Sequence, residues 1–438
     1  MKSINKEIFG LAIPNIISNI SIPLLSTVDT ILMGYLSPRH IGAVGIGSMV
    51  FNFIYWNFGF LRMGTTGLTA QAFGSGEKEQ IVNTLIRSSL LAVVIAIFIM
   101  IFHKPLGAMS AYLLNVSDEQ NGMVITYFTI RICAAPATMM IYGFKGWFFG
   151  MQNAVFPLIM TVGVNLLNIA VSAYLVIYLS WDITGVAWGT VVAQYFGLLL
   201  AICLYLFRYS DFNNYIKWHK VLQIDKVKEF FILNRDLFLR TVCLTFAFGF
   251  FYSQSSKGGE LILAANIILQ QFINWMSYGI DGFAHASESL VGKYIGAKND
   301  GKVKEAIKFS FVWGGVLALL YALVYSLFGG YIITLFSTDS EVISFTGEFI
   351  FWLAIFPLVA FLSYIWDGIY IGLGASRHMR NSMFIAMGVY MLSFYILKDD
   401  LGAHALWLAL LIFLLARAII QQFYYAKHGL ELSYTNCA

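Results

Sequence analysis

The amino-acid sequence predicts an all-α membrane protein that crosses the bilayer twelve times. Of its 438 residues, 59% are hydrophobic and 11% are charged, and the mean hydropathy is +0.74. Soluble domains carry roughly 25% charged residues, so the composition excludes that class. The apolar runs reach the ~20 residues that a helix needs to cross a bilayer, whereas the strands of a membrane barrel show ~10-residue alternating segments.

The twelve spans follow one another with one long interruption. They are predicted at residues 8–36, 41–73, 80–102, 121–147, 154–179, 184–208, 235–257, 260–296, 304–330, 344–374, 378–397 and 402–427. Several exceed a simple crossing and must tilt, bend or extend out of the membrane. The longest polar interval, 208–236, follows the sixth span. We therefore expect an N-terminal six-helix lobe at 1–207, a cytosolic linker at 208–234 with an amphipathic interfacial piece, and a C-terminal six-helix lobe at 235–438.

Lysine and arginine set the orientation of the spans, because they concentrate in cytosolic loops. With a cytosolic N-terminus, 19 of the 27 Lys and Arg residues, among them Arg87 and Arg417, fall on the cytosolic side. Four fall on the opposite side, and the other four lie in spans or at their edges. The bias predicts that both termini are cytosolic.

The two halves of the chain repeat at a constant offset. Ala70 and Gly74 pair with Gly292 and Gly296, each 222 residues apart. The same offset relates Gly146 to Gly368 and Gly150 to Gly372, and Pro136 pairs with Pro357 at an offset of 221. Six spans on each side of the linker give both halves the same orientation. The repeat is therefore parallel, with an axis along the membrane normal, and substrate sites of such proteins lie between the halves.

The first span carries an acidic residue, and the functional interpretation begins with it. A carboxylate inside a membrane helix costs several kcal/mol, so it normally faces a bundle interior or a water-filled cavity. Its prolines, Pro14 and Pro23, remove backbone donors from the same helix. The alternative is that the polar residues only bond neighbouring helices. One side of this helix carries Asn15, Asn19, Ser26 and Asp29.

The fifth span has one polar face. Thr161, Asn165, Asn168 and Ser172 follow i, i+4, i+7, i+11 spacing, which aligns them along a helix. Asn amides can donate to a carboxylate and accept from a carboxylic acid. The face could therefore hold Asp29 in both protonation states, or it could serve interhelical hydrogen bonding alone.

The eighth span has a longer polar stripe, which suits a water-filled cavity better than lipid. An alternative is that the inner end of this helix projects into the cytosol, which fits Glu288 better than Asp281. The stripe comprises Gln270, Asn274, Ser277, Asp281, His285 and Glu288.

Further charges lie within spans. Asp367 in the tenth span has Lys145 as its repeat partner. Arg131 and Arg240 need partners, which Asp281, Asp367 or an anionic substrate could supply; structural ion pairs are the favoured interpretation. From these patterns we expect a substrate cavity that includes Asn19, Gln270, Asn274, His285, Glu288 and Lys145.

Several stretches of the chain are distinctive: LRMGTTGLTAQAFGSG, LAANIILQQFINWMSYGIDGFAHASESLVG and IWDGIYIGLGASRHMRNSM, with IPLLSTVDT in the first span and VGVNLLNI in the fifth. On these stretches the chain resembles the multidrug and toxic compound extrusion (MATE) family, in its DinF branch, over nearly its whole length, from about residue 5 to 425. The resemblance implies the MATE fold, in which twelve transmembrane helices form two pseudo-symmetric six-helix bundles.

The resemblance also implies roles for particular residues. Related proteins use a first-helix aspartate as the proton site, beside a fifth-helix Asn and a sixth-helix Thr, and Asp29, Asn168 and Thr190 match them. A second fifth-helix acid is replaced here by Ser172, so a paired-carboxylate mechanism loses support. Cation-coupling acids of other branches include a tenth-helix acid, which Asp367 resembles. The seventh-helix acid is absent, with Gln254 the nearest polar residue. The expected coupling residues are Asp29, Asn168, Ser172, Thr190, Asp281 and Asp367.

We therefore expect a monomeric exporter of small amphipathic, drug-like, cationic compounds in a bacterial inner membrane. It would work by cation antiport, with H+ as the favoured coupling ion and Na+ as the alternative. No resident metal or cofactor and no nucleic acid are expected. A lipid-linked precursor flippase of the same superfamily is the second alternative. A membrane enzyme is disfavoured because HExxH and nucleophile-elbow motifs are missing. A major-facilitator carrier is disfavoured because FGSGEKEQ lacks that family's basic loop motif.

Overall fold

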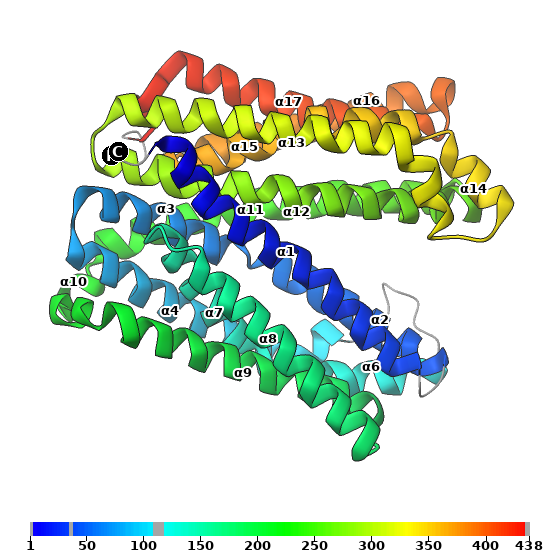
Figure 1. Cartoon of the computed structure of the whole chain (residues 1–438), viewed down its shortest axis with the longest axis horizontal. Coiled ribbons are helices and arrows are strands. Elements are labelled where there is room, and N and C mark those ends of the chain that lie inside the picture. The colour runs from blue at the N-terminus through cyan, green and yellow to red at the C-terminus, as the bar shows by residue number, and fades with distance from the viewer. Residues whose placement is uncertain (1–2, 35–37, 108–117, 434–438) are drawn as a thin grey trace. The chain divides into compact units, whose positions relative to one another are not determined.

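The computed structural model describes residues 3–34, 38–107 and 118–433, and every regular element in those ranges is helical. The first half of the chain begins with α1 (Ile4–Gly34), the longest helix before the linker. It is drawn in dark blue in Figure 1. It is followed by α2 (Pro38–Asn57), α3 (Phe60–Ser75), α4 (Lys78–Ile101), α6 (Asp118–Arg131), α7 (Ala135–Gly150), α8 (Val155–Ala173) and α9 (Asp182–Tyr209).

The second half of the chain begins after a short connecting region that contains α10 (Trp218–Val221). Its first two helices, α11 (Ile224–Lys257) and α12 (Glu260–Gly296), are among the longest of the described chain. They are followed by α13 (Asp300–Thr334), α14 (Ser340–Gly347), α15 (Ile350–Leu373), α16 (Ser376–Leu401) and α17 (His404–His428).

Three of the predicted spans that were too long for one crossing are each bent into two helices. The second span breaks between α2 and α3, and the tenth between α14 and α15. In the fourth span a 3-10 turn at Ile132–Ala134 separates α6 from α7. Pro136 stands at the start of α7, where its missing backbone N–H leaves no helical hydrogen bond unmade. The twelve predicted spans thus correspond to twelve helical stretches of the described chain.

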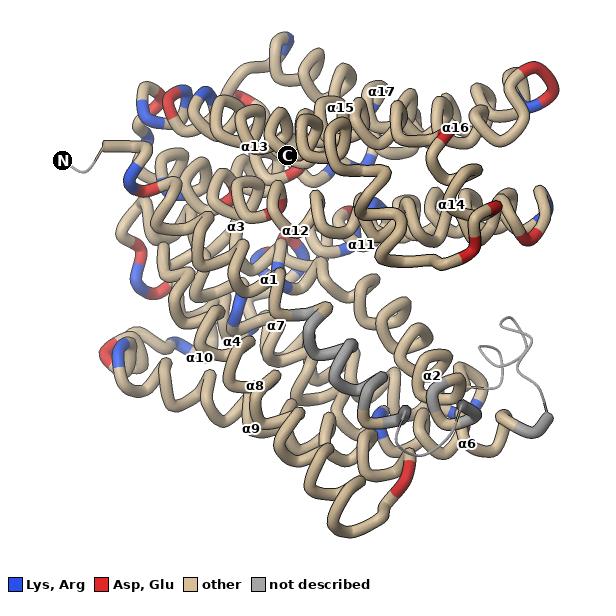
Figure 2. The backbone as a smooth tube through the Cα atoms, turned by 45° about the vertical axis from the view of Figure 1, so that its right-hand side comes forward, with Lys and Arg blue, Asp and Glu red and all other residues tan. Residues whose placement is uncertain are grey.

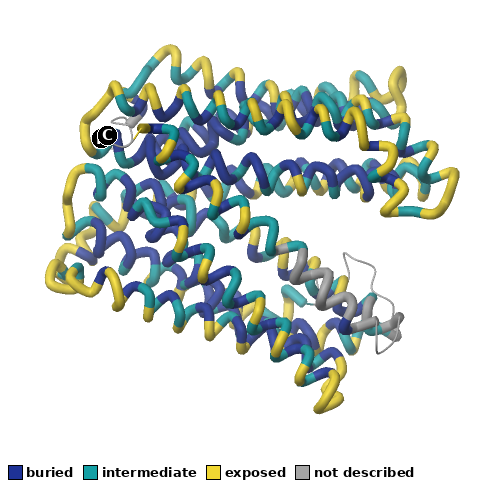
Figure 3. The backbone as a smooth tube through the Cα atoms, viewed as in Figure 1, coloured by how far each residue is buried: buried dark blue, intermediate teal, exposed yellow. Residues whose placement is uncertain are grey.

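Length and composition agree with a multi-pass membrane protein. Nine helical stretches of the described residues are long and apolar enough to cross a membrane. Charged residues gather at helix ends and loops, whereas the middles of α13 and α9 are almost free of them (Figure 2). Outer helices such as α9 and α13 alternate between buried and exposed strips (Figure 3), and large exposed side chains such as Leu327 and Phe207 are apolar. Apolar exposed strips are what a lipid-facing surface requires.

Contacts divide the chain into two compact units. One comprises residues 17–230 and is called the N-terminal unit below; the other comprises residues 1–16 and 231–438 and is called the C-terminal unit. Each has a core around a fully buried tryptophan, Trp147 in the first and Trp407 in the second. The Trp147 indole donates to the carbonyl of Ile81, and the Trp407 indole to the Oδ1 of Asn266. The predicted lobe boundaries at 207 and 235 stay a prediction.

The connecting region is tied to α4 in the N-terminal unit. Arg87 donates to the carbonyls of Lys220 and Val221 at 2.7 and 3.0 Å, and Lys220 forms an ion pair with Glu79 at 2.9 Å. The expected amphipathic piece corresponds to the start of α11, which begins at Ile224, before the predicted start of the seventh span.

The repeat predicted from the glycine spacing is visible in the packing. A Cβ on Gly146 of α7 would lie 2.4 Å from the carbonyl oxygen of Arg62 on α3. A Cβ on Gly368 of α15 would lie 2.1 Å from the carbonyl oxygen of Ala284 on α12. Arg62 and Ala284 are themselves 222 residues apart, which is the offset of the two glycines. The α3–α7 and α12–α15 pairs therefore pack in the same register.

Candidate functional site

The polar face predicted on α8 is buried against α9 in the N-terminal unit. Asn168, which is 1% exposed, donates through Nδ2 to the Oγ1 of Thr190 at 3.0 Å. The Ser172 hydroxyl lies 3.5 Å from the Oδ1 of Asn168, at the limit of a hydrogen bond. Gly189 allows this approach, because a Cβ there would lie 2.1 Å from the Ser172 hydroxyl. The structure thus brings together three of the predicted coupling residues.

The same face of α8 reaches α1. Asn165 donates through Nδ2 to the carbonyl and the hydroxyl of Ser21, each at 3.1 Å. Residues 21, 25 and 29 follow at i+4 steps, so Asp29 stands on the Ser21 side of α1, two turns further on. The backbone of Asp29 is helical, but its side chain lies outside the described part of the structure. Its proposed contacts with Asn168 and Thr190 therefore stay a prediction.

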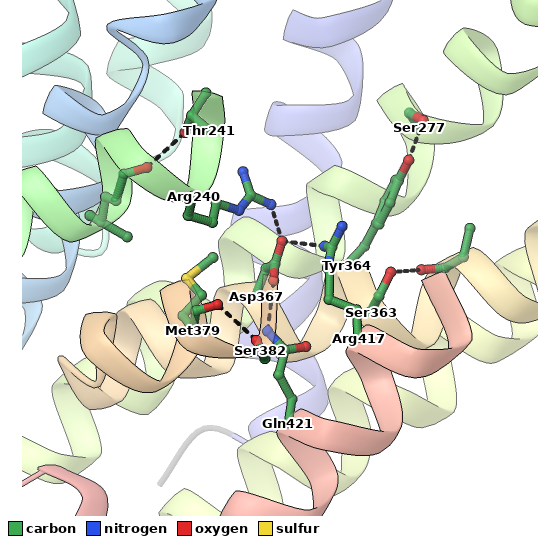
Figure 4. Close-up of polar contacts among 12 residues, drawn as sticks. Arg240, Thr241, Ser277, Ser363, Tyr364, Asp367, Met379, Ser382, Arg417 and Gln421 are labelled. Carbon is green, nitrogen blue, oxygen red and sulfur yellow. Dashed lines mark hydrogen bonds and ion pairs between the residues drawn. The ribbon is translucent and has the colours of Figure 1, made fainter. Parts of the chain in front are cut away.

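The main ionic cluster of the C-terminal unit surrounds Asp367, which is 7% exposed (Figure 4). Its Oδ2 accepts from two guanidinium groups, those of Arg240 on α11 and Arg417 on α17. Its Oδ1 accepts from the Nε2 of Gln421 at 2.9 Å. Buried charges need both a counter-ion and further hydrogen bonds, and this carboxylate has both. The structure thus gives Arg240 one of the partners that the sequence left open.

Two members of this cluster, Arg417 and Gln421, were missed from the sequence. The Lys and Arg count placed Arg417 on the cytosolic side, and that placement stays a prediction. In the structure its side chain is 0% exposed and donates to Asp367. The available signal was the pair itself, since two polar residues four positions apart in an apolar span share one helix face.

Part of the α12 stripe borders this cluster. The Ser277 hydroxyl lies 3.2 Å from the hydroxyl of Tyr364 on α15. Asp281, one turn further along α12 and half-buried, interacts electrostatically with Tyr364 and Arg417. Figure 4 shows Tyr364 beside Arg417, pointing toward Ser277. Asp281 and Asp367, which were both expected to take part in cation coupling, thus both interact with Arg417.

The remaining stripe residues have separate surroundings. Gln270 donates to the Oδ1 of Asn274 at 3.3 Å, and the Nδ1 of His285 lies 3.3 Å from the Oδ1 of Asn15 on α1. Glu288 is 0% exposed. The interpretation that the inner end of this helix carries Glu288 into the cytosol is therefore wrong. Asn19, expected in the same cavity, is half-buried on α1.

The in-span cations of the N-terminal unit have neutral partners among the described contacts. The Nζ of Lys145 donates to the Oγ1 of Thr161 at 2.7 Å. Arg131 donates to the hydroxyls of Tyr127 and Ser48 at 2.6 and 3.2 Å, and its guanidinium lies 5.0 Å from the centre of the Phe51 ring. Aromatic faces stabilise such cations. The described contacts of Arg131 thus include hydroxyls and aromatic rings, and its expected ion pair stays a prediction.

Chemically, these groups can hold charges and exchange protons. Among the described residues, no group of three His, Cys, Asp or Glu side chains could hold a metal ion. The titratable and polar groups instead form two sets. One is the buried amide and hydroxyl set on α8 and α9, and the other is the Asp367 cluster on α11, α15 and α17.

Comparison with known proteins agrees with this architecture. The family profile of MatE matches residues 14–174 and 238–396. The chain is 32% identical over 431 residues to DNA damage-inducible protein F of Escherichia coli (strain K12), covering 98% of this chain and 93% of that protein. It is 24% identical to a probable multidrug resistance protein NorM of Photorhabdus laumondii, covering 80% of this chain and 78% of that protein.

Solved structures show the same fold. A crystal structure described as MATE in the bent conformation superposes with a TM-score of 0.86 at 20% identity, covering 100% of this chain and 98% of that one. An outward-facing MATE multidrug resistance transporter of the MOP superfamily gives the same TM-score, 0.86, over 99% and 97% of the two chains. The chain is therefore a multi-pass membrane transporter, rather than an enzyme, and belongs to the MatE family.

Proposed function

We propose that this protein exports small amphipathic, drug-like compounds by antiport, with protons entering through Asp29 as the driving ion. The proposal rests on family membership and on relatives that are named as multidrug resistance proteins. The observation that carries the site is the buried set of Asn168, Ser172 and Thr190, together with the contact of Asn165 with α1 at Ser21.

Physical chemistry makes Asp29 a suitable proton carrier. Amides and hydroxyls can donate to a carboxylate and accept from a carboxylic acid, so they can stabilise the acid in either state. In the exporter we envisage, protonation changes the packing of α1 near its prolines. The cavity then opens alternately to the two sides of the membrane. Ser172 leaves Asp29 without a neighbouring acid on α8, so a single carboxylate carries the proton.

Coupling of transport to a sodium ion bound in the C-terminal unit has less support. A sodium ion at Asp367 would have to displace two guanidinium groups and an amide that already occupy both carboxylate oxygens. Asp281 is only half-buried and shares Arg417 electrostatically. We therefore regard Asp367 as a structural counter-ion, with proton coupling through Asp29 preferred over sodium coupling.

The cellular setting belongs to the same proposal. The distribution of Lys and Arg favours cytosolic termini. A bacterial inner membrane and a monomeric state are further parts of the proposal. Beyond the transported ion, the proposal needs no cofactor. Its substrates were expected from the resemblance to be cationic.

The decisive experiment imposes proton and sodium gradients separately on proteoliposomes. We expect an inward proton gradient alone to drive efflux of a fluorescent amphiphile, and Asp29→Asn to abolish it. Asp399→Asn, a substitution at an exposed site, is the control and should leave efflux unchanged. Efflux driven by sodium alone, or full activity in Asp29→Asn, would contradict the proposal.

A further inference from the structure

Lys145 stands within α7 with little to neutralise its charge. Its Nζ donates to the Thr161 hydroxyl at 2.7 Å, and that hydroxyl in turn donates to the carbonyl of Pro157 at 2.9 Å. An ammonium group carries three N–H donors. Among the described residues, the only acceptor within hydrogen-bond distance of it is the Thr161 oxygen. Two donors of a half-buried ammonium thus remain available to a ligand.

The neighbouring charge adds to the positive potential. Arg62 on α3 is the described ionised group that acts electrostatically on Lys145. The two helices touch at the adjacent position, because the missing Cβ of Gly146 lets the Arg62 carbonyl approach. Like charges repel more strongly in a low-dielectric setting than in water. An anion bound beside Lys145 would relieve this repulsion.

The repeat-related position shows what a neutralised site looks like. Residue 145 corresponds to residue 367 at the 222-residue offset. In the C-terminal unit that place holds a carboxylate, and the chain itself brings Arg240 and Arg417 to it. In the N-terminal unit the place holds a cation, and no carboxylate of the described residues acts on it. Among the described residues, a counter-ion lies beside this position in the C-terminal unit only.

We propose that Lys145, with Thr161 beside it and Arg62 on α3, forms a subsite that binds the anionic headgroup of an amphipathic ligand. The headgroup class is a carboxylate, sulfonate or phosphate, for which an ammonium serves as a point-charge partner. Lys145 is half-buried rather than fully enclosed by protein. The inference rests on the proposed transport function and specifies its substrates, which depart from the cationic class expected from the resemblance.

Equilibrium binding to the full-length protein in neutral-lipid nanodiscs tests the subsite without requiring transport. Three fluorescent probes share one apolar scaffold and end in a carboxylate, its methyl ester or a quaternary ammonium. The wild-type protein should bind the carboxylate more tightly than the ester. Lys145→Met should weaken carboxylate binding roughly tenfold or more, the usual effect of losing a charged hydrogen bond, and leave the ester unaffected.

Three further variants control for charge and structure. Lys145→Arg should restore most carboxylate binding, and Lys104→Met, at an exposed lysine, should change nothing. If Lys145 only locks α7 to α8, Thr161→Val should reproduce the Lys145→Met result. The proposed subsite instead predicts that Thr161→Val keeps most of the binding. Equal affinity of the wild-type protein for carboxylate and ester, or equal effects of Lys145→Met and Lys104→Met, would overturn the inference.

Further measurements identify the source of the ligand and test the subsite separately from the transport function. Displacement of the carboxylate probe by phosphatidylglycerol, but not by octyl phosphate, would support the subsite and assign its headgroup to a lipid. The reverse order would support a small soluble anion. Lys104→Met should export the ester probe under a proton gradient as the wild-type protein does, so transport is measured apart from the subsite. A wild-type protein that exports none of the probes would refute the transport function while the binding result stands.

Discussion

Asp367 accepts hydrogen bonds from side chains on two other helices. Arg240 comes from α11, whereas Arg417 and Gln421 come from α17, so one carboxylate joins three helices of the C-terminal unit. Both guanidinium groups are buried and need a counter-charge that solvent cannot provide. Removing the carboxylate would leave two cations together in a low-dielectric interior. The physical role of Asp367 is therefore structural first.

This role predicts a large loss of stability in Asp367→Asn. Breaking a buried ion pair by removing one partner costs about 3–5 kcal/mol, because the remaining charge is uncompensated. The temperature at which half of the purified protein stays monodisperse in detergent should fall by many degrees. Asp399→Asn removes an acid whose side chain is 83% exposed, and it should stay within about 0.5 kcal/mol of wild type. Equal behaviour of the two variants would show that the cluster is not structural.

At this scale the sequence predicted some partners and missed others for a physical reason. Helical spacing aligned Asn168 with Ser172, and the family resemblance brought in Thr190; the structure places the three together. Arg417 was missed as a partner of Asp367 because a count of Lys and Arg records a side of the membrane and not the contacts of each cation. Those contacts depend on tertiary packing, which places a carboxylate of another helix opposite the arginine, and one sequence does not reveal that pairing.

Among the elements, two helix pairs carry the internal repeat. Gly150 of α7 and Gly372 of α15 each meet a carbonyl of the facing helix, that of Thr66 and that of Glu288, at 2.9 and 2.7 Å from a built Cβ. Thr66 and Glu288 are again 222 residues apart. Small residues let membrane helices approach closely. The resulting van der Waals packing holds the helices together, because lipid leaves no hydrophobic driving force between them. The glycine spacing therefore encodes the packing register of each half.

This register predicts that Gly146→Ala and Gly368→Ala both destabilise the protein. Each added methyl group would meet a backbone carbonyl that cannot rotate away, and overpacking of this kind typically costs about 1–3 kcal/mol. Gly388→Ala in α16 is the matched control, since nothing lies within 4 Å of its Cβ position. That variant should be neutral or slightly stabilising, because Ala favours helix by about 0.8–1.0 kcal/mol over Gly. Thermal stability in detergent distinguishes the two outcomes.

The span boundaries could largely be predicted, because bilayer thickness fixes the length of an apolar helix. The early start of α11 could not be predicted, because its first two turns are largely polar. Packing, rather than the length of an apolar run, makes these turns helical. The sequence predicted that the second and fourth spans are longer than one crossing requires, but it did not locate the bends between α2 and α3 and between α6 and α7. The sequence marks one of them with Pro136, whereas the other follows a turn at Phe58 and Gly59.

For the molecule as a whole, α1 belongs to both units. Residues 4–16 of this helix are grouped with the C-terminal unit, and the rest with the N-terminal unit. The beginning of the helix is held by Glu7, whose Oε2 accepts from Lys293 at 2.7 Å and from the Tyr294 hydroxyl at 2.9 Å. Further on, Ser21 is held by Asn165 of α8. Residues 8–20 lie between these two contacts, and the division of the helix between the two units falls after residue 16.

Alternating access then predicts that α1 flexes between its two attachments rather than moving as one rod. Gly282 of α12 lies against Ile16, with 2.4 Å between its built Cβ and the Ile16 Cγ1, so Ile16→Cys with Gly282→Cys can form a disulfide. Ser21→Cys with Asn165→Cys fixes the other attachment. In a background without the native cysteines, each disulfide alone, and both together, should leave gradient-driven efflux within a few-fold of the reduced protein.

The reduced protein is the internal control, because adding a reductant restores freedom without changing the sequence. If either disulfide stops efflux and reduction restores it, α1 must leave that unit during the cycle, and the division of the helix at residue 16 is not kept in transport. If only the double disulfide stops efflux, each attachment can open while the other holds, and the flexing segment extends beyond residues 17–20. Unimpaired efflux in the doubly linked protein would leave those four residues, which lie between Pro14 and Pro23, as the part of α1 that bends.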